Sequence, residues 1–285
     1  ILMSFINQIS HLPSVKSLIK ENEIRPLKKL GQNFIFDLNI TNNIAKVAKC
    51  HNKDIIEIGP GPGALTRSIF IQGAKSIIAI EKDYKSIKCL QSLQDICGDK
   101  LKIIHDDILN LKLSDFGPFP KSIIANLPYN ISSKLIINWL KEINLNKDVL
   151  IDEITITIQK ELADKLISKV GDSNYGRISL ITNLLSSVSK EIELPPSVFF
   201  PKPKVYSSVI KIIPLKNPRF DVDLDMFEKL TKKAFGNRRK MLRQSLKEFG
   251  GRNLLKIANI NDYYRAQDLS TSEFCKLSKL YAKSN

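Results

Sequence analysis

Residues that commonly bind metals are scarce in this chain, which has 4 cysteines and 3 histidines among 285 residues. They form no Cys-x-x-Cys or His-x-x-x-His pair, the spacings typical of structural zinc sites, so we predict no metal site. Cys50 and His51 are adjacent, which alone is weak evidence for a metal site or a thiol nucleophile. We therefore interpret the cysteines as buried, inactive residues of a protein kept in a reducing compartment.

Long apolar segments are also missing. No run approaches the roughly 18 apolar residues of a membrane-spanning helix, and the mean hydropathy is −0.11. The N-terminus lacks the basic, apolar and small-residue regions of a signal peptide, and the opening Ile1-Leu2-Met3 allows a natural start at Met3. With 12 glycines and 13 prolines, collagen-like and low-complexity chains are excluded. These absences favour a globular, cytoplasmic protein.

Acidic residues are too few to balance the basic ones: 29 Asp and Glu face 44 Lys and Arg, a net charge of +15. Such an excess favours a polyanionic partner, with nucleic acid ahead of an anionic membrane surface. A basic surface without any partner is the alternative.

Short apolar runs alternate with helical patterns from residue 54 onward. Strands rich in Ile and separated by helices indicate a parallel sheet covered on both faces, so we predict a doubly wound, Rossmann-like α/β fold. Predicted strands are Ile55–Ile58, Ile77–Ile80, Leu101–Ile104, Ile123–Ala125 and Ile154–Ile158; predicted helices are Leu65–Ile71, Tyr84–Leu93, Ile131–Ile143 and Leu162–Val170. The runs Val188–Leu194 and Tyr206–Ile213 then close the sheet as a terminal antiparallel hairpin.

Beyond Pro214 and Pro218 only helical patterns remain, at Met226–Phe235, Lys240–Phe249 and Ser272–Ala282. We therefore expect a large domain over residues 1–216, with an N-terminal helical extension, and a small all-helical domain over 217–285. The small domain has 15 basic and 8 acidic residues, nearly half of the charge excess. Its segment 231–247 has seven basic residues and no acid, which favours contact with phosphates over a merely solvated face.

A glycine-rich turn, Gly59-Pro60-Gly61-Pro62-Gly63, follows the first predicted strand. Gly59, Gly61 and Ala64 satisfy the G-x-G-x-x-G/A pattern, in which glycines let the backbone approach a ligand. Glu81 stands 22 residues after Gly59 at the end of the next strand, where a carboxylate can accept both hydroxyls of a ribose. A plain tight turn and a solvated Glu are the alternatives. Together the two features predict a nucleoside cofactor.

An acid also ends the third predicted strand, in His105-Asp106-Asp107. Asp107 could accept a hydrogen bond from the exocyclic amine of the cofactor's adenine. The alternative is an Asp that caps the following turn.

The segment Asn126-Leu127-Pro128-Tyr129 follows the fourth predicted strand. An adenine amine is a poor nucleophile because its lone pair is delocalised into the ring. The Asn126 side-chain oxygen and the Leu127 carbonyl could accept its two N–H groups, which favours a pyramidal nitrogen with its lone pair directed at an electrophilic methyl. Pro128 stiffens the turn, and the base can stack on Tyr129. An ordinary turn is the alternative.

At this point the chain resembles the small-subunit ribosomal RNA adenine dimethyltransferases (KsgA type), over about residues 25–280. The motifs that carry the resemblance are Lys29–Phe34, the glycine-rich turn, Glu81, Asn126–Ser132, Gln159-Lys160-Glu161, Tyr175-Gly176-Arg177, Pro195–Ser207 and Ala234-Phe235-x-x-Arg238-Arg239-Lys240. The resemblance implies dimethylation of adenine in small-subunit (16S) ribosomal RNA, with S-adenosylmethionine as the cofactor, an immature ribosomal particle as the partner, no membrane, and a monomer.

The resemblance also implies roles for single residues. The expected cofactor contacts are Asn33, Ile35, Gly59, Glu81, Asp107 and Asn126, and the expected clamp on the target adenine is Asn126, Tyr129 and Phe199, with the Leu127 carbonyl. The family usually has Leu where Ile35 stands. Of the neighbouring rings Phe199 and Phe200, we expect Phe199 to close over the base and Phe200 to be buried; the alternative is that both rings pack into the core.

Other functions stay open. Methyltransferases that modify large-subunit RNA share the Asn-x-Pro-Tyr core but do not typically carry the Phe-x-x-Arg-Arg-Lys stretch. A DNA adenine methyltransferase would need a target-recognition insertion, and none is evident in the sequence. A dehydrogenase would need an acid or base for hydride transfer, and a non-catalytic ribosome-assembly factor would not need Asn126 and Tyr129.

Overall fold

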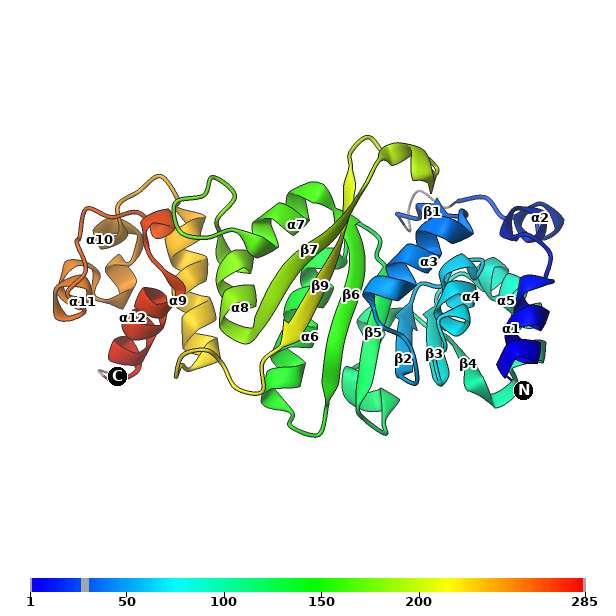
Figure 1. The fold of residues 1–285 in the computed structure, drawn as a ribbon. Coiled ribbons are helices and arrows are strands. Elements are labelled where there is room, and N and C mark those ends of the chain that lie inside the picture. Colours follow the sequence, from blue (N-terminus) through cyan, green and yellow to red (C-terminus); the bar gives the residue numbers. More distant parts are fainter. Residues whose placement is uncertain (1, 27–30, 284–285) are drawn as a thin grey trace. The chain divides into compact units, whose positions relative to one another are not determined.

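The computed structural model describes residues 2–26 and 31–283 of the chain (Figure 1). These divide into two compact units, one formed by residues 1–163 and 189–214, the other by 164–188 and 215–285. The division differs from the expected one because residues 164–188 belong to the same unit as the C-terminal residues. We call the two parts the sheet unit and the helical unit.

Seven strands of the described residues form one sheet, in the order β4-β3-β2-β5-β6-β9-β7. The strands are β2 (Asp54–Ile58), β3 (Ser76–Glu81), β4 (Leu101–His105), β5 (Lys121–Asn126), β6 (Ile151–Gln159), β7 (Ser186–Leu194) and β9 (Ser207–Pro214). The pairs β2–β3, β3–β4, β2–β5 and β5–β6 are parallel, and β6–β9 is antiparallel. The predicted doubly wound α/β fold is confirmed.

Helices cover the sheet on both faces; in Figure 1, α3 and α4 lie in front of it and α6 behind it. The helices that begin in the sheet unit are α1 (Leu2–Ser10), α2 (Val15–Glu21), α3 (Leu38–Val47), α4 (Ala64–Ile71), α5 (Tyr84–Cys97), α6 (Ser132–Leu145) and α7 (Lys160–Ile167). A separate two-stranded ribbon pairs β1 (Phe34–Ile35) antiparallel with β8 (Phe199–Phe200). It connects the segment before the sheet with the Pro-rich segment between β7 and β9.

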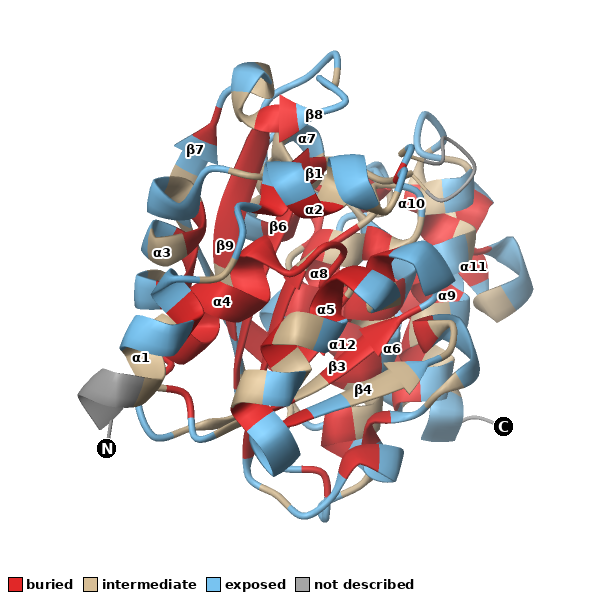
Figure 2. Ribbon diagram, turned by 90° about the vertical axis from the view of Figure 1, so that its right-hand side faces the viewer, coloured by how far each residue is buried: buried red, intermediate tan, exposed pale blue. Residues whose placement is uncertain are grey.

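The apolar pattern explains the burial (Figure 2). In β2 and β5 every residue but one terminal residue is buried, whereas the edge strand β4 is mostly half-buried or exposed. Central parallel strands are covered on both faces, so they need continuous apolar runs. Ile55, Ile69 and Ile77 join Phe70 and Ile124 in one core cluster between the sheet and its helices.

The chain order of the strands creates a topological switch point between β2 and β5. From β2 the chain adds β3 and then β4 on one side, and it returns to add β5 and β6 on the other side. In such sheets a crevice forms outside the carboxyl ends of the two central strands. Gly59 follows β2 and Asn126 ends β5, so the predicted motifs lie at this crevice.

The helical unit comprises α8 (Arg177–Leu185), α9 (Leu224–Gly236), α10 (Leu242–Ser245), α11 (Gly251–Ile257) and α12 (Thr271–Lys283). Phe227, Leu255 and Phe274 are fully buried in its core. The Tyr175 hydroxyl donates to the Leu269 carbonyl at 2.9 Å, so residues 164–188 are tied to the C-terminal segment by a buried hydrogen bond. The helix predicted over 240–249 is wrong, because the helical geometry there is limited to α10 and a separate 3-10 turn at Lys247–Phe249.

Within the described ranges no helix is both long and apolar enough to cross a membrane.

All four cysteines are buried with free thiols, as predicted. Burial raises the pKa of the Cys50 thiol to about 12, which makes it a poor nucleophile beside His51.

Candidate functional site

A cleft of about 210 Å³ opens at the carboxyl ends of β2, β3, β4 and β5. Its walls combine apolar side chains, such as Ile58, Ile80 and Ile108, with polar groups at the strand ends. Six of the predicted site residues line it: Asn33, Gly59, Glu81, Asp107, Asn126 and Leu127. The structure therefore brings together residues that span almost a hundred positions of the chain.

The glycine-rich turn has left-handed backbone geometry, with φ of 67° at Gly59 and 54° at Gly61. A Cβ on Gly61 would lie 2.8 Å from the Phe34 ring, so only glycine fits there. A Cβ on Gly59 would meet nothing within 4 Å, and Gly59 lines the cleft. The space that a side chain would fill at Gly59 is therefore available to a ligand.

Glu81 is 6% exposed and is held by two backbone N–H groups. Its Oε2 accepts from Gly61 N at 3.0 Å, and its Oε1 accepts from Asp83 N at 2.7 Å. Burial raises the pKa of Glu81, against the effect of these two donors, which stabilise its charged form. Each carboxylate oxygen can accept more than one hydrogen bond, so Glu81 can still accept from a ligand in the cleft.

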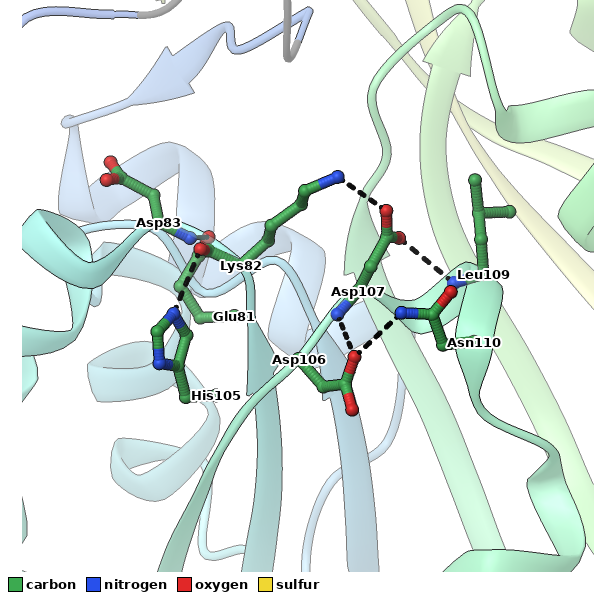
Figure 3. Close-up of polar contacts among 8 residues, drawn as sticks. All are labelled: Glu81, Lys82, Asp83, His105, Asp106, Asp107, Leu109 and Asn110. Carbon is green, nitrogen blue, oxygen red and sulfur yellow. Dashed lines mark hydrogen bonds and ion pairs between the residues drawn. The ribbon is translucent and has the colours of Figure 1, made fainter.

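Asp107 forms the centre of a second polar group, which Figure 3 shows. Its Oδ2 lies 2.6 Å from Lys82 Nζ, and its Oδ1 accepts from Leu109 N at 3.0 Å. Partial burial opposes ionisation of Asp107, but the hydrogen bond from Lys82 and that from Leu109 outweigh it and hold its pKa below the usual range. Leu109 N belongs to the next turn, so Asp107 caps that turn, which was the alternative to an adenine contact. Asp107 also lines the cleft, and its contact with the cofactor's adenine stays a prediction.

Sequence reasoning missed Lys82 as a member of this site. Lys82 follows Glu81 directly and lines the cleft. The sequence pattern assigned no role to Asp106, whose Oδ1 accepts from Asp107 N at 2.6 Å and from Asn110 Nδ2 at 3.0 Å. Asp106 thus fixes the turn that presents Asp107. A pair of opposite charges on neighbouring strand ends was the available signal.

Asn126 is oriented by Asn33, the residue directly before β1. Its Nδ2 donates to the Asn33 carbonyl oxygen at 2.7 Å. Because the amide nitrogen is used in this way, the side-chain oxygen is the end of the amide available to accept hydrogen bonds in the cleft. Leu127 N donates to Thr157 O of β6 at 3.1 Å, which fixes the peptide after Asn126 to the sheet.

Tyr129 is half-buried, and its hydroxyl lies 2.7 Å from Ser207 Oγ at the start of β9. This contact anchors the ring at one end and leaves part of it accessible. Ile35 is buried and lines a smaller cavity together with Gly59 and Asn126.

The expectation that Phe200 is the buried ring is wrong. Phe199 is 4% exposed and packs in the core cluster with Ile35, whereas Phe200 is 51% exposed and lies 5.8 Å from the Phe36 ring. Neighbouring side chains of a strand point to opposite faces, and the pairing of β8 with β1 decides which face is the inner one. The predicted stacking of Phe199 on the target base stays a prediction.

A buried acid, Glu57 in β2, is a further residue that sequence reasoning did not assign. It is completely buried, and neither carboxyl oxygen has a hydrogen-bond partner among residues 2–26 and 31–283. Burial raises the pKa of Glu57 to about 8; the nearby Thr66 hydroxyl opposes this shift and the charge of Glu81 adds to it. The signal was an acid inside an otherwise apolar strand, Ile55-Ile56-Glu57-Ile58.

Some of the motifs behind the sequence predictions lie elsewhere. Lys29 and Leu30 fall outside the described residues. Among the residues that are described, no group of three or more His, Cys, Asp or Glu side chains could hold a metal ion.

Arg238, Arg239 and Lys240 lie in the turn after α9 and are exposed. Arg238 donates to the Ser173 carbonyl at 2.9 Å and to Gln267 Oε1 at 3.0 Å, so it ties segments of the helical unit together.

Comparison with known proteins shows which family the chain is similar to. The model of the family described as ribosomal RNA adenine dimethylase matches residues 24–283. The protein called ribosomal RNA small subunit methyltransferase A of Allorhizobium ampelinum is 38% identical over 271 residues, which cover 94% of this chain and 98% of that protein. The protein of the same name from Agrobacterium fabrum is 38% identical over 273 residues, 95% of this chain and 98% of its own.

Solved structures show the same fold. A dimethyladenosine transferase from Plasmodium falciparum is similar with a TM-score of 0.71 and 25% identity, over 88% of this chain and 98% of that one. The 23S rRNA methyltransferase ErmE is similar with a TM-score of 0.63 and 22% identity, over 88% of this chain and 100% of that one. The second likeness concerns the fold alone.

Proposed function

The chain belongs to the ribosomal RNA adenine dimethylase family, and from this premise we propose that it transfers methyl groups from S-adenosylmethionine to the exocyclic amine of adenine in small-subunit (16S) ribosomal RNA, giving dimethyladenosine. The observation that carries the proposal is the meeting of Glu81, Asp107 and Asn126 in one cleft at the switch point of the sheet. The relatives of 38% identity are named for the small subunit, which favours that RNA over large-subunit RNA.

The residues of the cleft fit S-adenosylmethionine. Glu81 would hold the ribose hydroxyls, because it is a buried carboxylate at a strand end with spare acceptor capacity. Asp107 would accept the adenine amine, and the open space at Gly59 would let the cofactor approach the backbone. Asn33 and Ile35 would complete its surroundings. When bound, the cofactor supplies an electrophilic methyl group on a sulfonium sulfur.

Asn126, Leu127 and Tyr129 are the residues that we assign to the target base. The Asn33 carbonyl orients the Asn126 amide so that its oxygen can accept one N–H of the amine, and the Leu127 carbonyl can accept the other. These hydrogen bonds strengthen as the nitrogen becomes pyramidal, so they stabilise the transition state more than the ground state. Tyr129, anchored on Ser207, would support the base by stacking, and Phe199 would be the second ring of the clamp.

The proposed reaction takes place on one adenine, which many RNAs contain, so discrimination among RNAs requires a wider surface. The net charge of residues 217–285, 15 basic against 8 acidic, makes the helical unit the candidate for phosphate contacts. We infer that the substrate is RNA in an immature ribosomal particle and that a monomer acts on it.

The test is transfer of labelled methyl from S-adenosylmethionine to four substrates in parallel: immature small subunits, free small-subunit RNA, large-subunit RNA and duplex DNA. Mass analysis of the modified nucleosides then separates monomethyladenosine from dimethyladenosine. We expect dimethyladenosine in the small-subunit samples, with Asn126→Ala as the inactive control, and light scattering of the active sample should give the mass of one chain. Preference for large-subunit RNA or DNA would overturn the proposed substrate.

A further inference from the structure

Two tyrosines of the helical unit are exposed beside a hollow that the proposed function leaves unexplained. Tyr263 is 60% exposed and Tyr264 is 41% exposed, although the phenylalanines Phe227 and Phe274 of the same unit are fully buried. Both tyrosines line a hollow of about 760 Å³, which also includes Arg252 and Lys256. We call it the Tyr263 hollow. A large exposed ring beside cations is a feature of surfaces that bind unpaired nucleotides.

The turn that carries Tyr263 is fixed before any ligand binds. Asn261 accepts from Tyr263 N through its side-chain oxygen at 3.0 Å and from Tyr264 N through its carbonyl oxygen at 3.1 Å. The Tyr264 carbonyl accepts from Leu242 N at 2.7 Å, which joins the turn to α10. A ring held by such a turn loses little conformational freedom when a partner binds.

Arg243 covers part of the Tyr263 ring. The central carbon of its guanidinium lies 4.4 Å from the ring centroid, and its Nη1 lies 3.6 Å from Asp262 Oδ2. Tyr263 nevertheless stays mostly exposed, so a second planar group can stack on the ring. A cation on one side of an aromatic ring and a base on the other is a favourable arrangement, since both contacts use the π-face.

Two cations on one exposed side of α11 line the same hollow as the Tyr263 ring. Arg252 and Lys256 are four residues apart, so they lie on the same face of this helix. Asp262 accepts from Arg252 Nε at 2.7 Å and thereby orients the guanidinium, whose side chain stays 66% exposed. The hollow's other acid, Glu273, accepts from Ser270 N and Ser270 Oγ, both at 2.7 Å, at the start of α12. Asp262 thus pairs with Arg252 and Arg243, and Glu273 accepts hydrogen bonds at a helix end.

We propose that the Tyr263 hollow is a subsite for single-stranded RNA, in which an unpaired base stacks on Tyr263 and flanking phosphates bind Arg252 and Lys256. The proposal rests on the proposed function, because it takes the substrate to be RNA. It adds a defined binding surface whose lining residues all lie outside the segment 231–247, although Arg243 of that segment lies over the Tyr263 ring. The combination of a fixed aromatic ring with exposed cations favours RNA over an acidic peptide, which would need the cations but not the ring.

The experiment compares four variants of the full-length protein: Tyr263→Ala, Tyr263→Phe, the double variant Arg252→Ala with Lys256→Ala, and Lys276→Ala. Lys276 is an exposed lysine of α12 that does not line the hollow, so it is the matched charge control. Binding to immature small subunits and to a short single-stranded oligoribonucleotide is measured across a salt series. Thermal unfolding, cofactor binding and methyl transfer to the subunits are measured on the same samples.

We expect Tyr263→Ala to weaken RNA binding roughly tenfold or more, and Tyr263→Phe to stay within about twofold of wild type, because the phenyl ring still stacks. The double variant should lower the log–log salt slope by about 1.4, because two phosphates are no longer neutralised, while Lys276→Ala leaves it unchanged. Equal binding by wild type and Tyr263→Ala would overturn the proposal, and so would weaker binding of Tyr263→Ala and Tyr263→Phe alike.

A purely structural role of the ring is separated by the thermal data. If the RNA affinity of Tyr263→Ala fell only in proportion to its unfolded fraction, the stacking proposal would be wrong. Tight binding of an acidic peptide that competes with RNA and is indifferent to Tyr263→Ala would also overturn it. Failure of the proposed function has a different signature, namely that wild type itself does not methylate small-subunit RNA.

Discussion

The backbone N–H of Gly61 donates to the carboxylate of Glu81 across 3.0 Å. This hydrogen bond joins two motifs that lie 20 residues apart, the glycine-rich turn after β2 and the acid at the end of β3. Glu81 therefore holds the turn in shape, in addition to the contact with the cofactor that we propose for it. Substitutions of Glu81 therefore need a stability readout beside the binding readout.

Glu81→Ala should weaken S-adenosylmethionine binding by about 2–4 kcal/mol, because a charged acceptor of two ribose hydroxyls is removed. Calorimetry gives the affinity, and thermal unfolding shows how far the turn is destabilised. The ionised carboxylate is the better acceptor and burial raises the pKa of Glu81, so wild-type affinity should fall as the pH drops through that raised pKa. Unchanged affinity of the variant, or tight binding of a nicotinamide dinucleotide to wild type, would contradict the cofactor assignment.

The proposed contact of Asp107 with the adenine amine can be tested with a ligand that lacks this amine. Wild type should bind S-adenosylhomocysteine more tightly than its inosine analogue, which lacks the exocyclic amine. Asp107→Ala should abolish that preference, which is worth about 1.5–3 kcal/mol for a hydrogen bond to a charged acceptor. Lys82→Met is the control, since it removes the ion pair and keeps the acceptor. A preference that survives in Asp107→Ala would assign the amine to another residue.

The sequence predicted the sheet because its strands are defined by local patterns, and Ile-rich runs such as Ile55–Ile58 coincide with the observed strands to within three residues. Five residues of the cleft, Gly59, Glu81, Asp107, Asn126 and Leu127, could be placed there from the sequence because parallel strand ends meet at one edge of a sheet, whereas Asn33 was expected only from the family resemblance. What it missed depends on contacts between distant segments. Which of Phe199 and Phe200 is buried depends on the pairing with β1, and the place of residues 164–188 depends on Tyr175 and Leu269.

Tyr129 separates binding from chemistry. Tyr129→Ala should leave cofactor affinity near wild type while methyl transfer collapses, because we assign the ring to the target base and not to the sulfonium. Tyr129→Phe removes only the contact with Ser207 and should keep much of the activity. Asn126→Ala should lower both affinity and transfer. Single-turnover transfer and calorimetry measure the two effects, and more than about a tenth of wild-type turnover in Tyr129→Ala would refute stacking on this ring.

Glu57 should make stability depend on pH. Its folded-state pKa is about 8, against an ordinary value of 4.5, so between these values the folded state binds the extra proton. The free energy of unfolding should therefore fall as the pH rises from about 4.5 to about 8 and level off above. Glu57→Gln, which keeps the shape without the titration, should flatten that dependence, whereas the exposed Glu21→Gln should not. Urea unfolding at a series of pH values measures the slopes, and equal slopes in wild type and Glu57→Gln would show that Glu57 is ionised when folded.

The basic turn after α9 should divide into a structural and an RNA-binding part. Arg238 donates to Ser173 and Gln267, so Arg238→Ala should lower the stability of the helical unit by about 1 kcal/mol. Arg239 and Lys240 are exposed neighbours, and replacing both with Ala should leave thermal unfolding and cofactor binding unchanged while RNA binding weakens. The log–log slope of RNA affinity against salt concentration should fall by about 1.4–1.8, since each phosphate that the protein no longer neutralises lowers the slope by about 0.7–0.9. Titration of immature subunits across a salt series measures this slope. The same slope in wild type and the Arg239/Lys240 variant would place the phosphate-binding residues elsewhere, and the Tyr263 hollow is then the next surface to test, because its cations lie on α11 and not in this turn.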